Sequence, residues 1–111
     1  GHQTGDDALV HLARVLRETM RPHDTLARYG GEEFLIILPD TILPDAVSAL
    51  TRLQRELTKR FFLHKNEKLL ITFSAGVTAF LPDEPRNEAI ARADAAMYQA
   101  KKTGKNRVVS T

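Results

Sequence analysis

The most informative segment of this sequence is residues 29–34, which read Tyr-Gly-Gly-Glu-Glu-Phe. Strand-like runs at Thr25–Tyr29 and Glu32–Leu38 flank the glycines and predict a tight hairpin, because glycine supplies the positive φ that such a turn needs. At least one of the two adjacent carboxylates then faces the hairpin tip, where oxygen ligands suit Mg²⁺. The alternative is a solvated turn with exposed glutamates, and the residues by themselves leave both interpretations open.

Outward from this segment, periodicity predicts the other elements. Apolar residues at helical spacing predict helices at 6–20, 44–57 and 87–104, and alternation predicts strands at 68–80 and 107–109. Pro22 stops the first helix, Asn87 is a candidate N-cap of the third, and Gly104 marks its end. Strands in a hairpin, mixed with three helices, predict an α+β fold in which helices cover one sheet.

The composition describes a small, soluble domain with no basic excess. The 111 residues are 42% hydrophobic and 27% charged, with a formal net charge of +2. Because basic and acidic residues are nearly equal in number, the charge argues against a nucleic-acid partner. Cysteine is absent, which excludes disulfides and thiol catalysis, and no apolar run reaches the length of a membrane span. We expect a cytoplasmic domain. A membrane anchor elsewhere in the parent protein is compatible with this expectation.

Further charged residues are candidates for binding anions or bases. Arg21 and Asp24 are three apart at a helix exit, a spacing that fits a local ion pair or recognition of guanine or phosphate. Lys101, Lys102 and Lys105 gather at the end of the third helix, where the helix dipole is a sufficient structural explanation and triphosphate binding is the sharper one.

The first six residues place two glycines ahead of a helix. That pattern is similar to an anion-binding nest, but no Gly-Lys-Ser/Thr follows, so it is no Walker loop. Asp6 fits the N-cap of the first helix, and this reading is preferred without a ligand. The four histidines show no metal-binding spacing.

Taken together, four blocks resemble the GGDEF family, the catalytic domain of diguanylate cyclases, in its Gly-Gly-Glu-Glu-Phe form. The blocks are residues 1–6, 28–34, 72–77 and 93–108, and the match covers essentially all 111 residues. The resemblance implies a nucleotide-cyclase or palm-like (ferredoxin-like) mixed sheet with flanking helices. It also implies that residues 1–111 are one GGDEF domain lacking its N-terminal helix and its first, central strand.

The family's chemistry attaches to matching positions. In it, two GTP molecules, one on each subunit of a homodimer, are joined into cyclic di-GMP with loss of two pyrophosphates. By resemblance, Glu32 and Glu33 serve Mg²⁺ (or Mn²⁺) and activate the 3′-hydroxyl, with the identity of the base left open. Other substrate contacts are implied at Gly30 and Gly31 for the nucleotide, Asp6 for the guanine edge, and Lys101 and Lys105 for the terminal phosphates. The family more often has Arg at position 105, so that contact is expected to be monodentate.

The resemblance also implies an inhibitory site. Arg21 and Asp24 match the Arg-x-x-Asp motif at which the product binds in this family, and Arg52 matches a further arginine of that site. Cyclic di-GMP would bind there, away from the active site, and inhibit the enzyme by feedback.

The missing first strand sets two expectations. In the family it carries a metal-binding Asp, and removing a central strand leaves unpaired backbone groups on its neighbours. We therefore expect the 111 residues alone to be inactive, in a parent protein that supplies the strand and a sensor or regulatory domain. The alternative functions are a catalytically inactive GGDEF module that binds cyclic di-GMP or GTP, and an interaction domain without a nucleotide.

Overall fold

The computed structural model describes residues 2–111, which form two compact units. Of the described residues, 2–40 and 56–71 make the first unit, and 41–55 and 72–111 make the second. None of the described helices is both long and apolar enough to cross a membrane.

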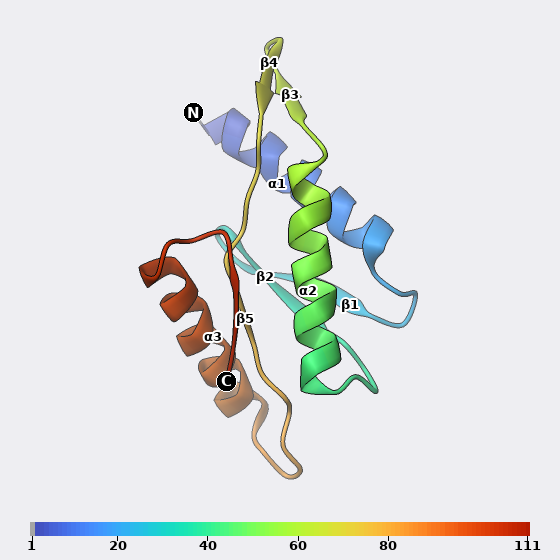
Figure 1. The fold of residues 1–111 in the computed structure, drawn as a ribbon, viewed down its shortest axis with the longest axis vertical. Helices are drawn as coiled ribbons and strands as arrows, with labels where there is room; N and C mark the ends of the chain where they lie inside the picture. Colours follow the sequence, from blue (N-terminus) through green and yellow to red (C-terminus); the bar gives the residue numbers. More distant parts are fainter. Residues whose placement is uncertain (1) are drawn as a thin grey trace. The chain divides into compact units, whose positions relative to one another are not determined.

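The first unit holds a long helix and two antiparallel hairpins (Figure 1). Helix α1 (His2–Thr19) precedes the hairpin of β1 (Thr25–Gly30) and β2 (Glu33–Ile37). The second hairpin joins β3 (Phe62–His64) to β4 (Glu67–Leu69). Leu12, Val15 and Leu16 are buried on one side of α1, at the three- and four-residue spacing of an amphipathic helix.

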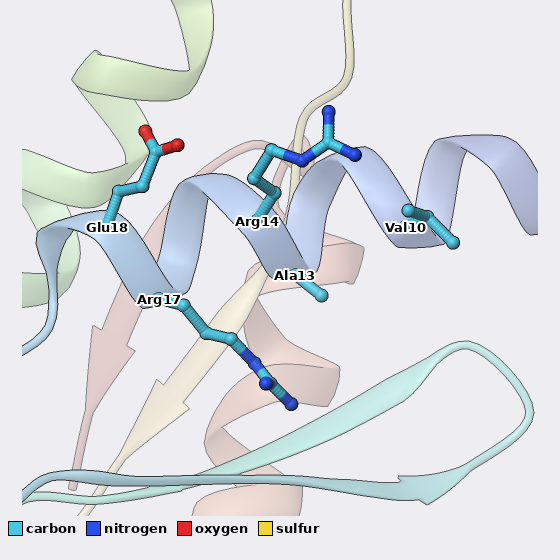
Figure 2. Close-up of a pocket in the computed structure, with 5 residues that line it drawn as sticks. All are labelled: Val10, Ala13, Arg14, Arg17 and Glu18. Carbon is cyan, nitrogen blue, oxygen red and sulfur yellow. The ribbon is translucent and has the colours of Figure 1, made fainter.

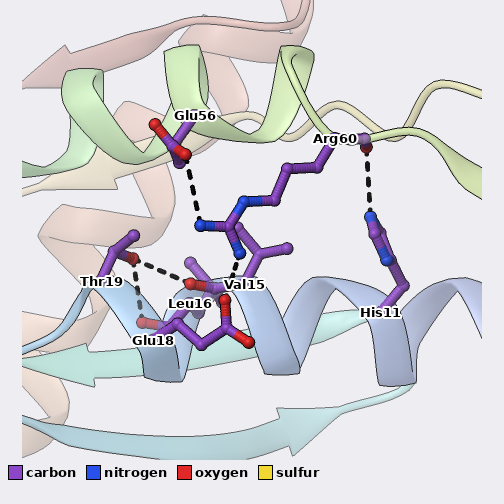
Figure 3. Close-up of polar contacts among 7 residues, drawn as sticks. All are labelled: His11, Val15, Leu16, Glu18, Thr19, Glu56 and Arg60. Atoms are coloured by element: carbon purple, nitrogen blue, oxygen red, sulfur yellow. Dashed lines mark hydrogen bonds and ion pairs between the residues drawn. The ribbon is translucent and has the colours of Figure 1, made fainter.

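Arg60 ties the end of α2 (Leu43–Thr58) to α1 within this unit (Figure 3). Its guanidinium donates to the carboxylates of Glu18 and Glu56, and its carbonyl oxygen lies 3.3 Å from Nε2 of His11. The pKa of Arg60 is raised above its ordinary value, chiefly by the hydrogen bond to Glu18. Leu57, in the last turn of α2, is buried.

The second unit contains a parallel β-α-β arrangement and also the greater part of α2. Strand β5 (Ala75–Val77) pairs in parallel with β6 (Val108–Ser110), and α3 (Arg86–Lys102) connects them. Ala89, Ala96 and Ala100 are buried on α3, and Ala46, Leu50 and Leu53 are buried on α2. Small side chains let α3 lie close to β5: a Cβ on Gly76 would lie 1.9 Å from the Ala93 carbonyl oxygen.

Arg92 on α3 clamps the loop that follows β5. It donates to both carboxylate oxygens of Glu84, at 3.0 and 2.5 Å, to the Thr78 hydroxyl at 2.5 Å and to the Ala79 carbonyl at 2.9 Å. The Glu84 carboxylate, 8% exposed, also accepts the Leu81 N–H at 3.0 Å. The hydrogen bond from Arg92 is the largest cause of the lowered pKa of Glu84. We call these residues the Arg92 clamp.

Most predicted elements are present, and the differences have local causes. The strand predicted over 68–80 is wrong as one element: β4 pairs with β3 and β5 pairs with β6, in different units. Asn87 is not the N-cap of α3, because the helix begins at Arg86 and Pro85 occupies the cap position. Gly104 does follow the end of α3, with φ of +131°, and the Lys105 N–H bonds back to the Ala100 carbonyl.

Candidate functional site

The β1–β2 turn presents the two predicted carboxylates to solvent. Gly30 pairs with Glu33, so Gly31 and Glu32 form a two-residue turn, and both glutamates are exposed. The register shifts between Arg28 and Gly30, which leaves Tyr29 as the extra residue of a β-bulge. The predicted hairpin is present. Its tip consists of Gly31 and Glu32 rather than of the Gly-Gly pair.

The two glycines are not required by the backbone of this turn. Neither has a positive φ, so the predicted reason for the Gly-Gly pair is wrong. A Cβ on Gly30 or Gly31 would meet no atom within 4 Å. Because the hairpin would accommodate alanine at both positions, the space over the glycines is open to an approaching molecule.

Arg28 braces the turn from the preceding strand. Its Nε and Nη2 both donate to the Gly31 carbonyl oxygen, at 3.1 and 2.5 Å. The sequence interpretation gave this arginine no role, although it lies in the same block as the glycines. Its proximity to the turn, two residues before Gly30, was the available signal.

Arg21 and Asp24 form a closed ion pair in the turn after α1. The guanidinium reaches both carboxylate oxygens, through Nη2 at 2.8 Å and Nε at 3.2 Å, and the Arg21 N–H donates to the same carboxylate at 2.8 Å. Nη2 also reaches the Pro39 carbonyl at 3.2 Å. This hydrogen bonding lowers the pKa of Asp24 and raises that of Arg21. The local ion pair expected from the spacing is therefore present, with the Arg21 side chain 46% exposed.

The remaining predicted residues lie elsewhere in the two units. Asp6 is exposed on α1, which begins at His2, so its predicted role as N-cap is wrong. The start of the predicted nest, Gly1, lies outside the described residues. In the second unit, Arg52 is exposed on α2, Lys101 is exposed in the last turn of α3, and Lys105 follows with φ of 60°.

The chemistry of the turn fits part of a site for a divalent cation. Two adjacent, exposed carboxylates offer hard oxygen ligands, and the open glycines leave room for a phosphate that would complete the coordination. Across residues 2–111, no cluster of three or more acidic or histidine side chains could hold a metal by itself. Glu32 and Glu33 by themselves fit as two of the oxygen ligands that a divalent cation would need.

Two shallow, open pockets lie on the first unit, and neither is lined by a predicted site residue. One lies on α1 and is lined by five residues that Figure 2 labels: Val10, Ala13, Arg14, Arg17 and Glu18. The other lies between α1 and the start of β3, where the rings of His11 and Phe62 are 5.5 Å apart. The turn of β1 and β2 is an exposed surface rather than a cavity.

An α+β domain that exposes Gly-Gly-Glu-Glu on a hairpin turn has the defining features of a GGDEF-type domain. The sequence matches the family described as "Diguanylate cyclase, GGDEF domain" over residues 1–107, and the chain belongs to that family. The fold class expected from the resemblance is confirmed by solved GGDEF domains.

Known proteins of this family are similar over nearly the whole chain. Diguanylate cyclase DgcP of Pseudomonas aeruginosa is 43% identical over 108 residues, which cover 97% of this chain and 16% of the relative. Diguanylate cyclase SiaD of P. aeruginosa, solved in complex with its activator SiaC, has a TM-score of 0.95 and 38% identity, covering 100% of this chain and 43% of that one. The GGDEF domain of DgcB from Caulobacter crescentus, solved with c-di-GMP, has a TM-score of 0.91 and 36% identity, covering 99% and 66%.

Proposed function

We propose that this domain condenses two GTP molecules into cyclic di-GMP and two pyrophosphates. The observation that carries the proposal is the exposed Glu32-Glu33 pair on an open glycine turn, in a chain that belongs to the GGDEF family. The 3′-oxygen of each GTP forms a bond to the α-phosphorus of the other, and the bond to the pyrophosphate breaks. Two domains in a homodimer each contribute one nucleotide.

Each proposed role comes from the resemblance to the GGDEF family and agrees with the chemistry of the residue. The open backbone at Gly30 and Gly31 accommodates the nucleotide, and Asp6 accepts hydrogen bonds from the N–H groups of the guanine edge. Glu32 and Glu33 hold Mg²⁺ or Mn²⁺, which when bound stabilises charge on the attacking and leaving oxygens. One of these carboxylates takes the proton of the 3′-hydroxyl. Lys101 and Lys105 neutralise the terminal phosphates as point charges.

We propose further that cyclic di-GMP inhibits the domain at Arg21, Asp24 and Arg52. The Arg21 side chain supports this, because its guanidinium is 46% exposed, is held in place by the buried Asp24 carboxylate, and can donate to the acceptor atoms of a guanine base or to a phosphate. The DgcB domain was solved with c-di-GMP, which supports the product as a ligand in this family. The SiaD complex with its activator supports control by a regulatory partner or sensor domain. We place the domain in the cytoplasm.

Incubating the full-length protein with GTP and Mg²⁺, followed by chromatography, tests the proposal. Cyclic di-GMP and pyrophosphate should form in a ratio of one to two. No product, together with calorimetric binding of cyclic di-GMP, would replace the cyclase by a catalytically inactive regulatory module. Neither product nor nucleotide binding would leave an interaction domain.

A further inference from the structure

The guanidinium of Arg28 grips one atom of the exposed turn. Arg28 lies on β1 opposite Phe34, one residue before the bulge at Tyr29. From there its Nε and Nη2 converge on the Gly31 carbonyl oxygen, at 3.1 and 2.5 Å. Two donors of a planar group that share one acceptor define both its position and its direction.

Little packing holds this turn in place. Gly30, Gly31 and Glu32 are exposed, and a Cβ on either glycine would contact nothing within 4 Å. Glycine also has the widest choice of backbone conformations. A turn of this kind samples many geometries unless hydrogen bonds select one, and Arg28 provides two such bonds.

Holding the Gly31 carbonyl also orients Glu32. The peptide group between Gly31 and Glu32 is planar, so the carbonyl oxygen, the Glu32 N–H and the Glu32 Cα move as one body. Glu33 follows as the first residue of β2 and pairs with Gly30. Fixing the Gly31 carbonyl oxygen therefore constrains the backbone positions from which the Glu32 and Glu33 side chains extend.

We infer that Arg28 is a positioning residue, which fixes the Gly31–Glu32 peptide so that the carboxylates meet the metal and nucleotide in a productive geometry. The inference rests on the proposed cyclase function. In this role Arg28 binds the protein's own backbone rather than the substrate, since its Nε and Nη2 both donate to the Gly31 carbonyl oxygen. Reaction rates are sensitive to displacements of about 1 Å, which cost up to roughly a hundredfold.

Steady-state kinetics of the full-length protein test the inference with Arg28→Ala, Arg28→Lys and, as the control, Arg17→Ala on the exposed face of α1. For Arg28→Ala, kcat should fall about ten- to a hundredfold, with KM for GTP changed less than about threefold. Arg28→Lys should recover part of the loss, because an ammonium offers one donor to the same oxygen. Arg17→Ala should match the wild type.

Amide hydrogen exchange of the same variants provides a readout independent of turnover. Amides of residues 31–33 should exchange about tenfold faster in Arg28→Ala, as for the loss of one hydrogen bond, while β3 and β4 are unchanged. A raised KM with wild-type kcat would overturn the inference, because Arg28 would then contact GTP. Wild-type kcat with faster exchange would overturn it too. A wild-type protein without cyclase activity would instead show that the proposed function had failed.

Discussion

Glu33 is exposed at the start of β2, so its carboxylate can be changed with little effect on packing. Glu33→Gln keeps the shape and removes the charge that would hold a cation or accept the hydroxyl proton. Cyclic di-GMP formation by the full-length protein should drop at least about a hundredfold, with an unchanged circular dichroism spectrum. Glu67→Gln, at an exposed position on β4, is the matched control and should keep full turnover. Retained turnover in Glu33→Gln would remove this residue from the mechanism.

Arg21 forms a local ion pair with Asp24, and in the proposed inhibitory site it would also bind cyclic di-GMP. Arg21→Ala should leave initial rates unchanged and raise the concentration of cyclic di-GMP needed for half-inhibition by at least about tenfold, the effect of losing a charged hydrogen bond. Inhibition curves with added product measure this. Arg17→Ala should keep wild-type inhibition. If Arg21→Ala is inhibited as strongly as the wild type, the second site lies elsewhere.

At the scale of single residues, spacing in the sequence predicted contacts that are local in the chain. Arg21 and Asp24 are three residues apart, and a turn brings such residues together whatever its detailed geometry. The bonds from Arg28 to the Gly31 carbonyl were not predictable in this way, because they depend on the bulge at Tyr29. The hairpin pattern predicted that at least one of Glu32 and Glu33 faces the tip, and both are exposed, whereas their metal and substrate roles remain predictions.

Among the elements, the contact between β5 and α3 leaves no room for a side chain at Gly76. In Gly76→Ala the new Cβ would lie 1.9 Å from the Ala93 carbonyl oxygen and 2.4 Å from the Met97 nitrogen, both backbone atoms of α3. We expect a loss of about 1–3 kcal/mol or more in the free energy of unfolding. Gly30→Ala is the control and should change it by less than about 0.5 kcal/mol. Urea unfolding checks both, and equal stabilities would contradict the close approach.

The Arg92 clamp predicts an acid-sensitive loop. The pKa of Glu84 is lowered from its ordinary value of 4.5, mainly by the hydrogen bond from Arg92. A lowered pKa in the folded state adds stability above the ordinary value, and this stability is lost as the pH falls through the lowered pKa. Glu84→Gln should therefore destabilise the protein at about pH 6, and the difference from the wild type should shrink toward about pH 3. Denaturant unfolding at both pH values measures it; a constant difference would show that the carboxylate is not charged in the clamp.

Elements with a strong period were predictable, and short strands were not. The stripe of Ala46, Leu50, Leu53 and Leu57 predicted α2, and all four side chains are buried. Strand β3 has three residues, too few for a period to be recognised, so the β3–β4 hairpin was missed. Its turn uses Lys65 and Asn66 with φ of 50° and 67°, the conformation of a two-residue type I′ loop.

For the molecule as a whole, the apolar surface suggests limited stability of these residues alone. The described residues include ten large apolar side chains that are half or more exposed, among them Val10, Ile37 and Phe61. We expect the isolated 111 residues to produce no cyclic di-GMP under conditions in which the full-length protein does. The assay is the same chromatography on both proteins at equal concentration. Product from the isolated chain would show that these residues suffice for catalysis.

The overall fold class was predictable because four sequence blocks occur in the order of one family, and the match to that family covers residues 1–107. The separation into two units was not, because the alternation over residues 68–80 continues across the boundary near Thr72. A strand-like pattern reports which side chains alternate, and it does not report which partner strand supplies the hydrogen bonds.

The bulge at Tyr29 gives the molecule a native optical probe. The chain has no tryptophan and two tyrosines, so its near-ultraviolet emission comes from Tyr29 and Tyr98. Both rings are more than half exposed: Tyr98 has the Lys102 ammonium 5.5 Å from its ring centroid, and Tyr29 adjoins the open glycine turn. In a Tyr98→Phe background a single fluorophore would remain, one residue from Gly30, and its quenching by an added purine nucleotide would report occupancy of the turn without any label.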